Sequence, residues 1–136
     1  MEDLDQQLIE AATRGDLDVC NDLLVRGADI NANDYKGKTP LHWASEEGHT
    51  NVCEMLLDRG ADINANDYKR KTPLHKASWK GRAGVCALLL VCGADVNAKN
   101  NVGETPLYVA SRHDRIQVLF TEWKVFTRRF NLIALL

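Results

Sequence analysis

The sequence predicts an all-α solenoid, a row of stacked helix-turn-helix units, and three observations support this prediction. First, residues 34–66 recur as residues 67–99 without a gap, and 20 of the 33 positions are identical. Second, the three prolines of the chain, Pro40, Pro73 and Pro106, hold the same place in successive units. Third, the apolar residues of each unit follow the spacing of one helix face. A single domain built from repeats follows.

Both full copies contain the motif Thr-Pro-Leu-His-x-Ala, at residues 39–44 and 72–77. A period of 33 residues that carries this motif resembles the ankyrin repeat, and the resemblance covers residue 1 to about residue 119. It implies an ankyrin-repeat solenoid of helix pairs joined by projecting β-turn or hairpin loops. The chain then divides into about four units: an N-terminal capping repeat (1–33), repeat 2 (34–66), repeat 3 (67–99) and a degenerate C-terminal repeat with an apolar tail (100–136).

The first unit lacks the repeated motif but keeps two helices. Asp3 or Asp5 suits the start of a helix over residues 2–14, because carboxylates are favourable at the N-terminal end of the helix dipole. Gly15 ends this helix, and a second helix should end before Gly27. The first helix is indicated by apolar residues at helical spacing, Leu4, Leu8, Ala11 and Ala12. A terminal repeat with a polar outer face is what a solenoid needs for solubility.

The inner helix of repeat 2 is expected to begin at the repeated motif. Thr39 is a natural N-cap, and Pro40 occupies the first helical position, where its missing N–H costs nothing. The helix should run to about Glu47, where Gly48 ends it, and His49 should open the outer helix. Repeat 3 is expected to follow the same plan.

Two features of the repeats bear on structure and function. His42 and His75 lie three residues after the capping threonine, where an imidazole can bond the cap or the adjoining loop backbone, and this structural role is favoured over a ligand or catalytic role.

Arg70 stands where the neighbouring units have Gly37 and Gly103. Because only glycine adopts positive φ freely, we expect some strain at this loop tip.

Repeat 4 departs from the pattern after Ala110. Its tail places large apolar residues within one arc of a helix, of the width expected for a core-facing stripe: Ile116, Leu119, Phe120, Trp123, Phe126, Phe130 and Ile133. The favoured interpretation is a modified outer helix that closes the stack. The alternative is an oligomer or membrane-surface contact, so self-association through residues 120–136 stays open.

The cysteines are expected to be reduced. Cys20, Cys53 and Cys86 lie 33 residues apart and so occupy equivalent places in three units. Equivalent points in stacked helical layers are roughly 8 to 10 Å apart, whereas a disulfide needs Cα atoms within about 7 Å. These three residues should fill the core, and only Cys92 should be exposed.

Charge and targeting signals limit the function. The net charge of −2 conceals a gradient, because the four units carry −6, −3, +5 and +2 in order. The start of the chain lacks the regions of a secretory signal and no apolar run has transmembrane length, so we expect a cytoplasmic or nuclear protein, and a membrane partner is disfavoured.

The sequence also lacks the motifs of catalysis. It contains no phosphate-binding glycine loop, no His-Glu-x-x-His, no Cys-x-x-Cys and no nucleophile-elbow serine. We therefore expect a non-catalytic protein with no cofactor and no metal.

The resemblance implies a binding surface formed by the loop tips and the exposed side of the inner helices. Most of these positions vary between repeats, whereas the leucine, glycine, alanine and proline positions hardly change. Carried over by register, the candidate partner-binding residues are Tyr35, Lys36, Lys38, Trp43, Glu46 and Glu47 in repeat 2; Tyr68, Lys69, Arg70, Lys71, Lys76, Trp79 and Lys80 in repeat 3; and Asn101, Val102, Glu104, Arg112 and His113 in repeat 4.

Two classes of partner fit this surface. Aromatic and basic side chains suit an acidic segment of another protein, since tyrosine, tryptophan and arginine are common anchors of interfaces. The alternative is nucleic-acid binding through the basic patch of repeat 3, with Tyr68 and Trp79 as stacking platforms. The −9 carried by the first two units would repel phosphates, so a protein partner is favoured.

Overall fold

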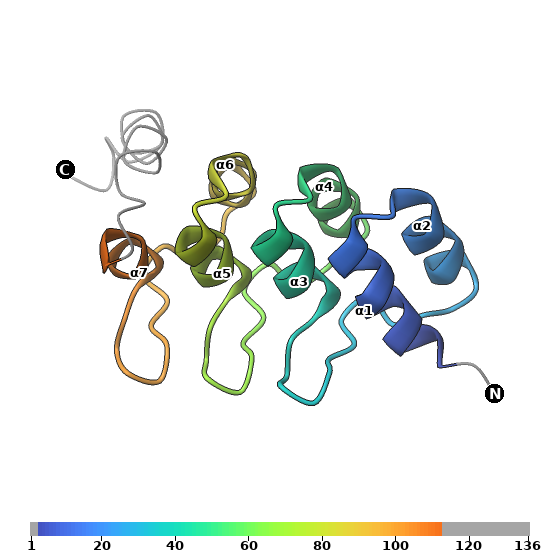
Figure 1. The fold of residues 1–136 in the computed structure, drawn as a ribbon, viewed down its shortest axis with the longest axis horizontal. Helices are drawn as coiled ribbons and strands as arrows, with labels where there is room; N and C mark the ends of the chain where they lie inside the picture. Colours follow the sequence, from blue (N-terminus) through green and yellow to red (C-terminus); the bar gives the residue numbers. More distant parts are fainter. Residues whose placement is uncertain (1–2, 113–136) are drawn as a thin grey trace.

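The computed structural model describes residues 3–112, and in that part of the chain it contains seven helices and no strand. The helices are α1 (Leu4–Arg14), α2 (Leu17–Val25), α3 (Pro40–Glu47), α4 (Thr50–Asp58), α5 (Pro73–Lys80), α6 (Ala83–Val91) and α7 (Pro106–Arg112). Figure 1 shows them in two rows, with α1, α3, α5 and α7 in one and α2, α4 and α6 in the other. The all-α solenoid is confirmed. No helix within residues 3–112 is long and apolar enough to cross a membrane.

The helix boundaries follow the residues that predicted them. Asp3 caps α1 by accepting a hydrogen bond from the Gln6 N–H, and α1 begins at Leu4 rather than at residue 2. Thr39 and Thr72 cap α3 and α5, each followed by proline at the first helical position. The predicted tail helix lies outside the described residues.

The turn between paired helices depends on a glycine at the end of α1, α3 and α5. Gly15, Gly48 and Gly81 adopt left-handed conformations, with φ of 76°, 78° and 71°. At Gly15 a Cβ would also lie 2.5 Å from Nδ1 of His49, which belongs to the next repeat. Glycine is needed here for both its φ and its size.

The core runs the length of the described solenoid. Its largest fully buried side chains are Leu8, Leu23, Leu41, Leu56, Leu74, Leu89 and Leu90. Cys20, Cys53 and Cys86 are fully buried and Cys92 is exposed, as predicted. Burial raises the pKa of Cys20 and Cys53 to about 11 and that of Cys86 to about 12, so these thiols stay protonated at neutral pH.

The buried histidines tie each repeat to the next one. His42 accepts the Thr39 N–H at Nδ1 (3.0 Å), and its Nε2–H donates to the carbonyl oxygen of Lys71 (2.8 Å). His75 repeats both contacts with Thr72 (3.1 Å) and with the Glu104 carbonyl (2.8 Å). The predicted structural role is confirmed. Burial lowers the pKa of both histidines, which favours the neutral ring, and the backbone N–H that points at Nδ1 leaves the proton on Nε2.

The loops that join the repeats are short hairpins that bond to one another. In the loop of repeat 2, Asp34 N–H donates to the Lys38 carbonyl (3.0 Å), and the Asp34 carboxylate accepts the N–H groups of Lys36 and Lys38. The next loop adds a bond from Tyr68 N–H to the Lys36 carbonyl (3.0 Å). Each loop is therefore fixed by its own aspartate or asparagine and by its neighbour. Figure 1 shows the three loops projecting together from the row of inner helices.

Arg70 is the one non-glycine residue within residues 3–112 that has positive φ, at 61°. The expectation of a strained loop tip is confirmed. At the equivalent Gly37, a Cβ would lie 2.6 Å from Cδ1 of Tyr68. The following loop carries Asn101 in the place of Tyr68, so the ring that covers Gly37 has no counterpart above Arg70.

Substitutions at the two loop-tip positions, Arg70 and Gly37, should have opposite effects on stability. Arg70→Gly should raise the free energy of unfolding by about 1 kcal/mol, because glycine removes the cost of the left-handed conformation. Gly37→Arg should lower it by more, because it adds that cost and a clash with Tyr68. Urea unfolding followed by circular dichroism measures both. A less stable Arg70→Gly variant would mean that the arginine side chain outweighs its backbone strain.

Candidate binding groove

The loops and inner helices line three cavities that open to solvent along one side of the solenoid, which we call the groove face. The first, of about 370 Å³, lies between α1 and the first loop and is lined by residues that include Glu10, Arg14 and Tyr35. The second, of about 390 Å³, lies between the loops of repeats 2 and 3. The third, of about 230 Å³, lies between α5 and α7. The groove face therefore crosses every described repeat.

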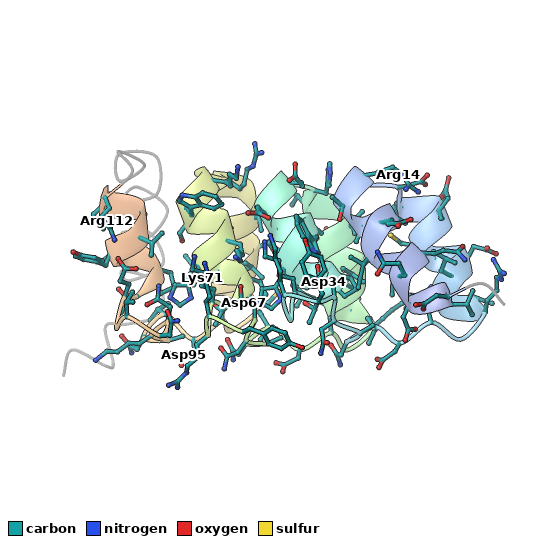
Figure 2. All side chains as sticks on the ribbon, turned by 60° about the horizontal axis from the view of Figure 1, so that its bottom comes forward. Arg14, Asp34, Asp67, Lys71, Asp95 and Arg112 are labelled. Atoms are coloured by element: carbon teal, nitrogen blue, oxygen red, sulfur yellow. The ribbon has the colours of Figure 1, made fainter. Side chains whose placement is uncertain are left out.

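The second and third cavities share one boundary. The second is lined by Tyr35, Lys36, Lys38, Glu46, Asp67, Tyr68, Lys69, Lys71, Lys76 and Trp79. The third is lined by Lys71, His75, Lys76, Trp79, Asn100, Glu104, Val109 and Arg112. Three residues of repeat 3 line both, namely Lys71, Lys76 and Trp79. Figure 2 shows Asp34, Asp67 and Lys71 following one another along this side of the molecule.

In repeats 2 and 3, the first residue contacts a side chain nine positions later. Asp34 accepts the indole N–H of Trp43 (2.8 Å), and Asp67 pairs with the Lys76 ammonium (3.1 Å). In repeat 4 the corresponding residues are the uncharged Asn100 and Val109. Asp34, Asp67 and Asn100 are not among the residues predicted from the sequence, although their recurrence at one register is a signal that points to them.

In repeats 2 and 4, the fifth residue pairs with the residue eight positions later. The Lys38 ammonium is 3.8 Å from the Glu46 carboxylate, and Arg112 pairs with Glu104. Lys38 also lies over the Trp43 ring, 4.2 Å from its centre. In repeat 3 these two positions are Lys71 and Trp79, which line the same two cavities.

Burial divides the predicted basic surface into two kinds of lysine. Lys38 and Lys76 are only 9% and 5% exposed and are paired with buried carboxylates, although the register had placed them on the open side. Burial alone would raise the pKa of Asp67, but the Lys71 N–H and the charge of Lys76 outweigh it and hold that pKa below its usual range. Lys36, Lys69 and Lys80 are exposed, and Lys71 is half-buried.

The aromatic residues of the two loop tips are open to solvent. Tyr35 is 82% exposed and Tyr68 is 71% exposed. Trp79 is 39% exposed, with the Lys80 ammonium 4.6 Å from its ring centre. Large rings left in water beside a groove are typical of interaction sites, because their burial by a partner is favourable.

The remaining candidate residues differ in how far they are exposed. Glu47, Asn101, Val102 and Arg112 are exposed, and Trp43 and Glu104 are half-buried. Glu46 is buried and pairs with Lys38. Arg70 is exposed but lines a separate cavity of about 340 Å³, bounded by residues that include Asn64, Asp95 and Lys99. His113 lies outside the described residues. Within residues 3–112, no group of histidine, cysteine and acidic side chains could hold a metal ion.

Stacked helix pairs with hairpin loops along one face define an α-helical repeat protein. The family model for ankyrin repeats, in three copies, matches residues 8–100, and the chain belongs to the ankyrin-repeat family. Ankyrin repeats are generally non-catalytic modules that bind other proteins. No significant match was found among curated proteins.

The Asp67 and Lys76 pair predicts a non-additive effect on stability. Lys76→Val alone should lower the free energy of unfolding by about 3 kcal/mol, because it leaves a buried carboxylate without its cation. Adding Asp67→Asn reproduces the Asn100 and Val109 combination of repeat 4 and should recover most of this loss. Urea unfolding of the two single variants and the double variant measures the coupling. A double variant no more stable than Lys76→Val would show that packing, and not charge, was lost.

Proposed function

We propose that the chain is a non-catalytic interaction module that binds an acidic segment of another protein along the groove face. One observation carries the proposal: the second cavity is lined by three lysines that form no ion pair within residues 3–112, and by three exposed aromatic residues. The lysines are Lys36, Lys69 and Lys71. The same cavity contains two carboxylates, Glu46 and Asp67, and both are already paired. The charge of the cavity that is not neutralised by these ion pairs is therefore positive.

The two kinds of side chain should contribute differently. Trp79 and Tyr68 offer large rigid surfaces whose burial costs little conformational entropy, so they suit the role of anchors. Exposed lysines attract a partner of opposite charge and fix its orientation, and they affect the association rate more than the final affinity. We place the protein in the cytoplasm or nucleus, where its thiols would stay reduced.

Nucleic acid is the weaker candidate. Lys38 and Lys76, which belong to the basic patch of repeat 3 or adjoin it, are neutralised by buried carboxylates. A phosphate backbone would also pass the acidic first and second repeats. If nucleic acid were the ligand, binding would be tight at low salt and would weaken steeply as salt is added.

The proposal predicts separable effects of two variants on a partner captured by immobilised wild-type chain and identified by mass spectrometry. Trp79→Ala should weaken binding by about 2 kcal/mol or more, through faster dissociation, because it removes an anchor. Lys71→Glu combined with Lys80→Glu should slow association and reduce its salt dependence, two effects that Trp79→Ala should not have. Surface plasmon resonance measures both rates.

Arg59→Glu supplies the matched control, because Arg59 is an exposed cation at the end of α4, away from the groove face. Circular dichroism should show that every variant remains folded. Affinities within a factor of two of the parent for both groove variants would place the binding site elsewhere.

A further inference from the structure

One register position distinguishes repeat 3 from its neighbours. In repeats 2 and 4, the fifth residue has an opposite charge eight positions later, in the pairs Lys38–Glu46 and Glu104–Arg112. In repeat 3 the fifth residue is Lys71, and Trp79 stands eight positions later. Within residues 3–112, Lys71 has no carboxylate in ion-pair range. The charge that completes this position in the flanking repeats is absent from repeat 3.

Lys71 is held in a fixed place at its backbone. Its N–H donates to the Asp67 carboxylate (2.9 Å), and its carbonyl accepts from the Asp67 N–H (3.0 Å) and from His42 Nε2 (2.8 Å). Asp67 is itself held by the Lys76 ammonium. The backbone of the half-buried Lys71 is therefore held rigidly between the second and third cavities, and Lys71 lines both of them.

The surroundings of Lys71 favour a single negative charge. The third cavity contains the Glu104 carboxylate, and the second contains Glu46 and Asp67. Each of these carboxylates already has its own cation, so the charge left unbalanced at this point is the single one of Lys71. One carboxylate balances it, whereas a phosphate carries nearly two charges. Trp79 provides an apolar wall next to this point in both cavities.

Resting on the proposed function, we infer that the partner supplies the missing charge: an aspartate or glutamate pairs with Lys71, and a neighbouring apolar side chain of the same segment packs on Trp79. The carboxylate then takes the role that Glu46 has in repeat 2. Lys71 is the residue that specifies an acidic side chain, while Lys38 and Lys76 serve the scaffold.

Selection from a library of random twelve-residue peptides tests this inference on the full chain. Wild-type protein should enrich peptides with an acidic residue beside a large apolar one. Trp79→Glu should abolish the acidic preference, because it supplies the counter-charge from within, whereas Trp79→Gln should keep it. Lys71→Glu should replace the acidic residue with lysine or arginine. Lys99→Glu, a reversal of an exposed lysine outside these two cavities, should leave the preference unchanged.

The most enriched peptide then allows a double-mutant cycle between its acidic residue and Lys71. Replacing its acidic residue by the matching amide should weaken binding to wild type about tenfold, as expected for a hydrogen bond to a charged group. The same replacement should change binding to Lys71→Met by less than twofold. Isothermal titration calorimetry provides the four affinities.

Three outcomes would overturn the inference: no enriched peptide, enrichment without an acidic residue, or an acidic preference that survives Lys71→Met. The last would leave the proposed function intact, because the groove would still select acid through another lysine. The proposed function fails separately if the captured protein partner binds Trp79→Ala and the double lysine variant as tightly as wild type.

Discussion

The hydrogen bond from a buried histidine to the loop of the next repeat is the interaction on which the rest of the structure depends. His42 caps its own helix through Nδ1 and holds the Lys71 carbonyl through Nε2, and His75 does the same with Glu104. One side chain therefore fixes where a helix begins and where the neighbouring loop lies. Because the anchored carbonyls belong to the fifth residues of the repeats, the same bonds that stack the solenoid also place Lys71 and Glu104 on the groove face.

The charged side chains along the groove face fall into two groups. The pairs Asp67–Lys76 and Lys38–Glu46 are buried, so they fix how loop and helix pack against each other. Under the proposed function, recognition falls to the exposed rings and to the lysines that form no ion pair within residues 3–112. The basic excess of repeat 3 thus overstates the charge that is available to a partner.

Repetition explains how much could be predicted from the sequence. The motif at residues 39–44 and its copy predicted the helix starts and the histidine bonds, and the 33-residue spacing predicted the buried cysteines, because each role recurs at one register. The strain at Arg70 followed from comparison with Gly37. Burial of Lys38, Lys76 and Glu46 could not be predicted, because register gives the face of a helix but not the partner toward which a long side chain bends. The binding role of the candidate residues stays a prediction, as does the apolar tail.

The central claim is that the partner binds the face formed by the loops and inner helices. Amide hydrogen exchange of the full chain, with and without the captured partner, tests it most directly. The account predicts slower exchange at residues 34–38 and 67–71, the loops that carry Tyr35, Tyr68 and Lys71, with little change in α2, α4 and α6. Protection confined to those outer helices, with unchanged exchange in the loops, would contradict it.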